Sequence, residues 1–129
     1  MMHFLYNTGI RFYQFLIWVV SFRNPKAKKW LSGRKNLFEK IKKEVVPGDH
    51  LLWFHVSSLG EFEQARPVIE GVKKRFPKYR ILLTFFSPSG YELKKNYPHA
   101  DYVYYLPLDT PRNASKFLDL IQPEKVFFV

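Results

Sequence analysis

The sequence contains no cysteine, which excludes disulfides, thiol chemistry and cysteine metal sites. It also lacks a long hydrophobic run, because the longest uninterrupted apolar stretch, Phe15–Val20, falls far short of the roughly 20 residues that span a bilayer. No internal repeat, low-complexity segment, GxGxxG fingerprint or P-loop is present, so an ordinary dinucleotide site is not expected. The chain has 129 residues, about the length of one domain. Its content of 47% hydrophobic and 19% aromatic residues is sufficient for a packed core.

The net charge of +10 is distributed unevenly along the chain. Residues 1–43 hold ten Lys/Arg and one acid, a net of +9, whereas residues 44–129 hold eleven Lys/Arg and ten acids, a net of +1. The basic third is also the most apolar third. That combination is typical of segments that bind an anionic membrane surface. No RNA- or DNA-binding motif accompanies it, so no nucleic-acid partner is expected.

Residues 1–24 are predicted to form an apolar helix, and residues 25–46 a basic linker or helix. Within the apolar stretch the polar residues form one narrow helical stripe, made of Asn7, Arg11, Gln14 and Ser21. Basic residues follow it, placed to meet anionic lipid: Arg23, Lys26, Lys28, Lys29, Arg34 and Lys35. No cleavage site of small residues follows, which argues against a signal peptide. We expect a membrane-associating helix whose basic flank is cytoplasmic; the alternative is a core helix of a soluble domain.

Residues 47–129, which open with Pro47-Gly48, alternate between short apolar runs and amphipathic stretches. The expected strands are His50–Val56, Ile81–Phe86, Tyr102–Leu106 and Lys125–Val129, and the expected helices are Gly60–Phe76, Ser89–Asn96 and Pro111–Ile121. This order predicts a Rossmann-like α/β domain with a parallel sheet and helices on both faces. Pro67 is an objection to the first of these helices. Val129 lies in an apolar run without a stop signal, so the sheet is expected to continue beyond residue 129.

Ligands of such sheets bind at the carboxyl ends of the strands, which draws attention to Glu61. The spacing Ser58-x-x-Glu61 matches a capping box, in which serine and glutamate satisfy free amides of the helix start. The same spacing recurs at Ser89-x-x-Glu92. Glu61 also follows Gly60, which permits close approach of a ligand. Glu61 is therefore either a helix cap or a general base that accepts a proton from a substrate hydroxyl.

Other polar residues follow the first two strands and could bind a substrate. These candidates are Ser57, Ser58, Gly60, Ser87, Ser89 and Gly90, with capping and turn formation as the alternative. His55 is interpreted as a core histidine or one that supports the site from behind. Asp109 is interpreted as a turn or cap residue, and Arg66, Lys73, Lys74 and Arg75 as a solvated helix face. No group with metal-ligand spacing is evident, so no metal site is expected.

Four segments make the chain similar to the N-terminal domain of the 3-deoxy-D-manno-octulosonate (Kdo) transferases. They are H-x-S-S-x-G-E at 55–61, I-L-L-T-x-x-S-P-x-G at 81–90, L-P-L-D at 106–109, and K-K-W-L-S-G-R-K-N at 28–36 after the apolar start. The resemblance covers nearly the whole chain.

The resemblance implies a GT-B glycosyltransferase, of which this chain is the N-terminal, acceptor-side half. Such enzymes transfer Kdo from CMP-Kdo to the lipid A precursor with inversion and without a metal or cofactor, at the cytoplasmic face of the cell inner membrane. Glu61 would be the general base. A second acid and the CMP-Kdo site would lie beyond Val129, so this chain alone is expected to be inactive. Another GT-B lipid glycosyltransferase and a non-catalytic membrane-recruitment domain remain the alternatives.

Overall fold

The computed structural model describes residues 1–47 and 50–129, so Gly48 of the Pro47-Gly48 pair lies outside the described residues. Three helices come first: α1 (Met2–Ser21), α2 (Pro25–Arg34) and α3 (Leu37–Glu44). Strands and helices then alternate as β1 (Leu51–Val56), α4 (Leu59–Arg75), β2 (Arg80–Phe85), α5 (Pro88–Lys94), β3 (Tyr102–Tyr105), α6 (Pro111–Ile121) and β4 (Lys125–Phe128). The predicted alternation is confirmed. Helix α4 runs through Pro67 without interruption.

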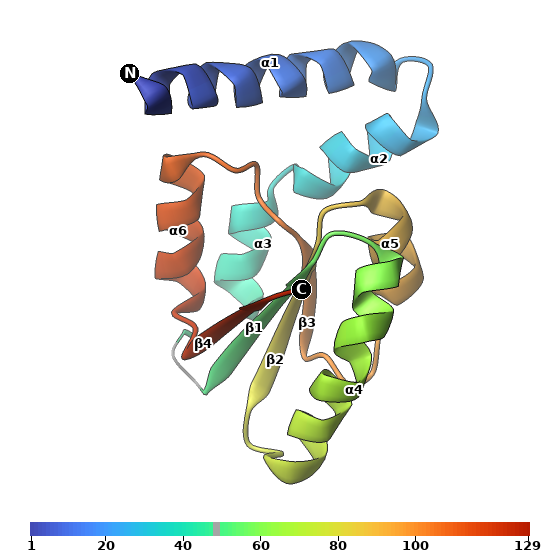
Figure 1. The fold of residues 1–129 in the computed structure, drawn as a ribbon, viewed down its shortest axis with the longest axis vertical. Helices are drawn as coiled ribbons and strands as arrows, with labels where there is room; N and C mark the ends of the chain where they lie inside the picture. The colour runs from blue at the N-terminus through green and yellow to red at the C-terminus, as the bar shows by residue number, and fades with distance from the viewer. Residues whose placement is uncertain (48–49) are drawn as a thin grey trace.

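The four strands form one parallel sheet in the order β3-β2-β1-β4 (Figure 1). Strand β1 lies between β2 and β4, with Phe54 beside Leu83 on one side and Phe127 on the other. All six residues of β1 are buried, as expected for a parallel strand covered on both faces. Because the strands are parallel, their carboxyl ends meet at one edge of the sheet.

Helices cover both faces of the sheet, as predicted. Alternate residues of each strand point to opposite faces. On one face, Leu51 and Trp53 of β1 pack with residues of α3 and α6, among them Ile41 and Phe117. On the other face, the core contains Leu52, Phe54, Val56, Phe62, Ala65, Ile69, Ile81, Leu83 and Phe85, with α4 and α5 outside. The sheet is thus the middle layer of an α/β/α sandwich.

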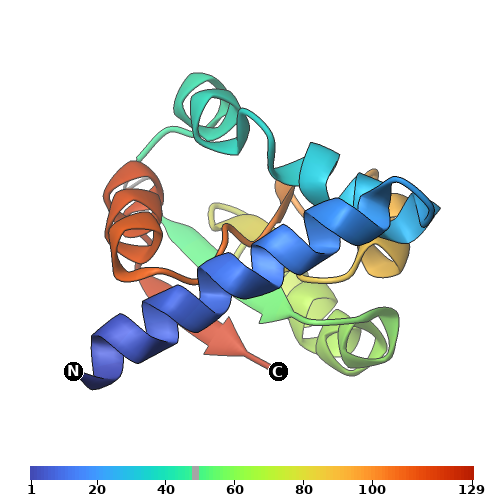
Figure 2. The same cartoon turned by 90° about the horizontal axis from the view of Figure 1, so that it is seen from above.

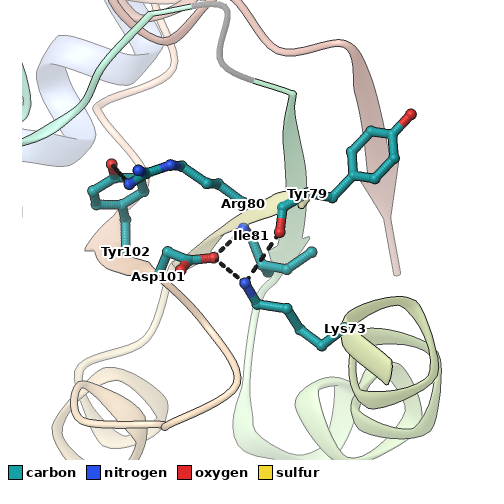
Figure 3. Close-up of polar contacts among 6 residues, drawn as sticks. All are labelled: Lys73, Tyr79, Arg80, Ile81, Asp101 and Tyr102. Atoms are coloured by element: carbon teal, nitrogen blue, oxygen red, sulfur yellow. Dashed lines mark hydrogen bonds and ion pairs between the residues drawn. The ribbon is translucent and has the colours of Figure 1, made fainter. Parts of the chain in front are cut away.

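The amino ends of β2 and β3 are joined by a polar cluster that has a structural role (Figure 3). Lys73 of α4 lies 2.7 Å from the Asp101 carboxylate and donates to the Tyr79 carbonyl at 3.0 Å. Asp101 also accepts from the Ile81 amide at 2.7 Å. The prediction of a solvated face is therefore wrong for Lys73, whereas Arg66 is exposed and pairs with Glu63.

Helices α1 and α2 lie beyond the carboxyl ends of the strands, and α1 crosses over that edge of the sheet (Figures 1 and 2). Tyr6 of α1 donates a hydrogen bond to Asp109, the residue before the cap of α6. Two members of the polar stripe of α1 face the domain, since the side-chain oxygen of Asn7 is buried and Gln14 lines a cavity there. Ile10 and Ile17 are also partly buried, whereas Arg11 of the stripe is exposed.

The outward face of α1 is apolar and exposed. Phe4 is 71% exposed, Phe12 60% and Phe22 73%, and α1 contributes no buried residue. Many bulky apolar side chains of α1 thus face away from the core, unlike those of an ordinary surface helix. None of the helices in the described part of the chain is long and apolar enough to cross a membrane.

Candidate functional site

Glu61 lies in the first turn of α4, directly beyond the carboxyl end of β1. Its carboxylate turns back toward the strand and accepts a hydrogen bond from the Ser57 backbone amide. Ser58 is the N-cap residue but makes no side-chain cap bond. The predicted capping box is therefore wrong in its serine half, and its glutamate half binds the amide one residue before the cap. The result is a carboxylate held at the strand end through one of its two oxygens.

The second predicted capping box, at Ser89 and Glu92, is also wrong. Pro88 occupies the first helical position of α5, so the helix begins one residue earlier than the pattern indicates. Ser87 is the N-cap, and its hydroxyl accepts from the Gly90 amide at 3.3 Å. Glu92 points along the helix and pairs with Lys95 at 3.1 Å. The two S-x-x-E segments are consequently not equivalent.

The loops after β1 and β2 bring several predicted site residues together. The Ser87 amide donates to the Ser57 carbonyl at 2.9 Å, which joins the two loops. The hydroxyls of Ser87 and Ser89 are 3.4 Å apart. Ser57, Glu61, Ser87 and Ser89 thus gather at the carboxyl edge of β1 and β2.

The two glycines at these helix starts differ in their surroundings. A Cβ on Gly60 would meet only the Ser58 hydroxyl, at 4.0 Å, so Gly60 leaves open space beside Glu61. A Cβ on Gly90 would lie 2.7 Å from the Phe85 ring and 3.4 Å from the Leu59 amide. Gly90 therefore serves close packing of α5 against β2 and the start of α4, and its own amide is used by Ser87.

His55 lies buried near the end of β1, as the core interpretation predicted. Its Nδ1 is 2.9 Å from the Thr84 hydroxyl, which also accepts a hydrogen bond from the Trp53 indole at 2.8 Å. Burial lowers the pKa of His55, while Glu61 opposes that shift and Arg34 adds to it. The neutral ring is therefore favoured, and a Thr84 hydroxyl that donates to Nδ1 leaves the ring proton on Nε2.

Arg34 is the residue of this edge that the sequence analysis misplaced, since it was predicted to meet lipid. Its guanidinium is directed inward and donates to three backbone carbonyls. Nε donates to that of Leu106 at 2.9 Å, Nη1 to that of Trp30 at 3.1 Å and Nη2 to that of Phe86 at 3.2 Å. Phe86 and Leu106 directly follow β2 and β3. Burial lowers the pKa of Arg34 to about 10, so the group remains charged at neutral pH. The sequence feature that could have indicated an inward-facing segment was Trp30, an aromatic residue within a basic run.

The arrangement can support acid–base and anion-binding chemistry. It combines one carboxylate, one neutral imidazole, one partly buried guanidinium and several hydroxyls at one edge of the sheet. Among residues 1–47 and 50–129, no group of three or more His, Asp or Glu side chains could hold a metal ion.

Comparison with known proteins identifies the family to which most of the chain is similar. The family model for 3-deoxy-D-manno-octulosonic-acid transferase (kdotransferase) matches residues 29–129. The chain is 38% identical over 79 residues, 60% of its length, to the 3-deoxy-D-manno-octulosonic acid transferase of Aquifex aeolicus, of which the match covers 22%.

Two further relatives bear the same name. The Haemophilus influenzae protein is 28% identical over 109 residues, 84% of this chain and 25% of the relative. The Chlamydia pneumoniae protein is 34% identical over 106 residues, 80% of this chain and 23% of the relative. The chain thus matches about a quarter of the length of these curated relatives. From the family match across most of its residues, we conclude that the chain belongs to the Kdo transferase family.

Proposed function

We propose that this chain forms the acceptor-side half of a GT-B glycosyltransferase that moves Kdo from CMP-Kdo to the lipid A precursor. Residues 47–129 would be the Rossmann-like acceptor domain, and CMP-Kdo would bind a second domain. The observation that carries the proposal is the Glu61 carboxylate, held at the carboxyl end of β1 beside the open space at Gly60. This edge is where parallel α/β sheets bind their ligands.

In the proposed reaction, Glu61 accepts the proton of an acceptor hydroxyl. The hydroxyl oxygen attacks the anomeric carbon of Kdo, and CMP leaves with the electron pair of the broken bond on its phosphate oxygen. Attack from the side opposite CMP inverts the anomeric carbon. Neither a metal nor a cofactor takes part. Ser57, Ser58, Ser87 and Ser89 would orient the acceptor through their hydroxyls, and Gly60 would admit it, whereas Gly90 would act through packing alone.

A hybrid polypeptide tests the proposal, because this chain covers only part of its relatives. In this hybrid the chain replaces the corresponding N-terminal segment of the Aquifex aeolicus relative, and transfer from CMP-Kdo to the lipid A precursor is measured. Transfer by the hybrid would support the proposal. A hybrid that melts cooperatively and binds CMP-Kdo but transfers no Kdo would contradict it. Parallel assays with other lipid acceptors distinguish a different lipid glycosyltransferase.

We further propose that residues 1–24 lie on the cytoplasmic face of the inner membrane, with residues 25–46 as the basic flank. The supporting observation is the exposed apolar face of α1, on which Phe12 is 60% and Phe22 73% exposed. Vesicles that contain anionic lipid should bind the chain, and salt should weaken the binding. Unchanged binding after removal of residues 1–22 would contradict this role. Membrane recruitment without catalysis becomes the better account if vesicles bind the chain but the folded hybrid is inactive.

A further inference from the structure

A cavity of about 430 Å³ lies between the N-terminal helices and the loop that follows β3. It is lined by residues of α1, α2 and α3, of the loop after β3 and of the first turn of α6, together with Lys35 directly after α2. The lining includes Gln14, Trp30, Arg34, Lys35, Leu108 and Asn113. Its charged lining residues are Arg34 and Lys35, and none of its described lining residues is acidic. This volume is within the range of small-ligand sites. The cavity is therefore suited to an anionic group.

The guanidinium of Arg34 has unused donor capacity. Three of its five N–H groups donate to backbone carbonyls, and one N–H remains on each Nη nitrogen. The carbonyls and the rings around it fix the group in place, with the Trp30 ring centroid 4.0 Å and the Tyr105 ring centroid 5.0 Å from its central carbon. A fixed fork of this kind binds two oxygens of a phosphate or carboxylate at once.

Buried donors beside Arg34 lack partners. The indole N–H of Trp30 and the hydroxyl of Tyr105 make no hydrogen bond within the described part of the chain, although both residues are at least 95% buried. A buried polar group without a partner is costly and calls for an explanation. Trp30 is also one of the residues that line the cavity, which is why its indole N–H rather than the Tyr105 hydroxyl is assigned to the site.

We propose that Arg34, Lys35 and the indole N–H of Trp30 form a binding site for a phosphomonoester, carried by the sugar headgroup of the acceptor. Four donor nitrogens are available, two from Arg34 and one each from Lys35 and Trp30, which suits the three oxygens of a phosphomonoester better than the two of a carboxylate. The cavity also adjoins α1, whose outer face would meet the membrane. This inference rests on the proposed function for the identity of the acceptor.

The test is a titration of the ¹⁵N-labelled chain, followed through the three tryptophan indole resonances at constant ionic strength. The probes are glucosamine 1-phosphate, inorganic phosphate and acetate. We expect a saturable shift of the Trp30 resonance with glucosamine 1-phosphate, weaker binding of inorganic phosphate and the weakest of acetate. The Trp53 resonance serves as an internal reference, because its indole N–H is buried and already bonded to Thr84. Trp30→Phe assigns the resonance.

Lys35→Gln should weaken binding of glucosamine 1-phosphate by roughly three- to tenfold. Lys42→Gln, an exposed position on α3 outside the cavity lining, removes the same charge and should leave the affinity unchanged. The proposal is overturned if Trp30 does not respond, if acetate binds as well as the phosphates, or if both lysine variants weaken binding alike. Equal affinity for the two phosphates would overturn the assignment to a sugar headgroup.

The outcome is distinguishable from that of the proposed function. Kdo transfer by the hybrid together with an unresponsive Trp30 resonance removes the phosphate site and leaves the function in place. Phosphate binding at Trp30 in a hybrid that folds but transfers no Kdo removes the proposed function and leaves the phosphate site in place.

Discussion

Helices α4 and α5 begin beside each other at the carboxyl edge of the sheet, with the same S-x-x-E spacing, yet their glutamates are used differently. Glu61 turns back to the strand end and is held by the Ser57 amide, whereas Glu92 pairs with Lys95 along its helix. The serine that caps is also different, because Ser87 caps α5 but Ser58 makes no side-chain cap bond in α4. A carboxylate that caps imperfectly but faces the ligand edge is a candidate for chemistry.

The largest expected difference between the two helix starts is in turnover of the hybrid enzyme. Glu61→Gln keeps the size and the hydrogen-bonding oxygen but cannot accept a proton, so turnover should fall by roughly 10²- to 10⁴-fold. Glu92→Gln removes an exposed ion pair and should cost little activity. Rates are compared per folded enzyme. Equal losses in the two variants would mean that Glu61 is only part of the helix start.

The glycines should differ in stability. Gly90→Ala places a methyl group against the buried Phe85 ring, and we expect a loss of about 1 to 3 kcal/mol in the free energy of unfolding. Gly60→Ala enters open space and should leave stability unchanged or raise it, because alanine favours the helix. Urea unfolding of both variants measures the difference. A greater loss for Gly60→Ala would show that the packing at the two helix starts is assigned the wrong way round.

The serines should differ by less. Ser87→Ala removes the hydroxyl that accepts a hydrogen bond from the Gly90 amide. Loss of such an N-cap typically lowers the free energy of unfolding by about 1 kcal/mol. Ser58→Ala removes no cap bond and should cost less. Thermal melting of the two variants under identical conditions measures the difference. A larger loss of stability in Ser58→Ala than in Ser87→Ala would mean that Ser58 does cap α4.

The smallest expected effect is a pH dependence of stability that arises from His55, near the end of the strand that leads into α4. Burial lowers the pKa of His55 below its ordinary value of 6.5, so the unfolded chain takes up a proton that the folded chain resists. This group leaves the free energy of unfolding unchanged above about pH 6.5 and lowers it as the pH falls below that value. Urea unfolding between about pH 5.5 and 7.5 should therefore depend less on pH in His55→Gln. His99→Gln, at an exposed position, is the control, and an unchanged slope in His55→Gln would contradict the assignment.

The contrast between α4 and α5 also shows what could be predicted from the sequence. The parallel α/β sheet follows from buried runs such as Leu51–Val56 alternating with amphipathic helices, and the structure confirms it. The start of α5 was missed because Pro88 fixes the first helical position, which makes Ser87 the cap. The S-x-x-E spacing alone does not contain that information.

Arg34 was missed for a different reason. In the sequence it is one of several basic residues, and only the docking of α2 directs it inward. That docking depends on Gly33, where a Cβ would lie 2.0 Å from the Tyr105 ring. Such contacts join residues distant in sequence, so periodicity and local charge do not reveal them.

The pH dependence of turnover in the hybrid enzyme tests most directly whether Glu61 is the base. In the unsubstituted hybrid, the rate should fall at acid pH, because a general base works only in its deprotonated form. Glu61→Gln should lose that acid limb and retain a low, nearly constant rate, while Glu92→Gln keeps the full profile. A Glu61→Gln enzyme that shows the same acid limb at nearly the same rate would contradict the account.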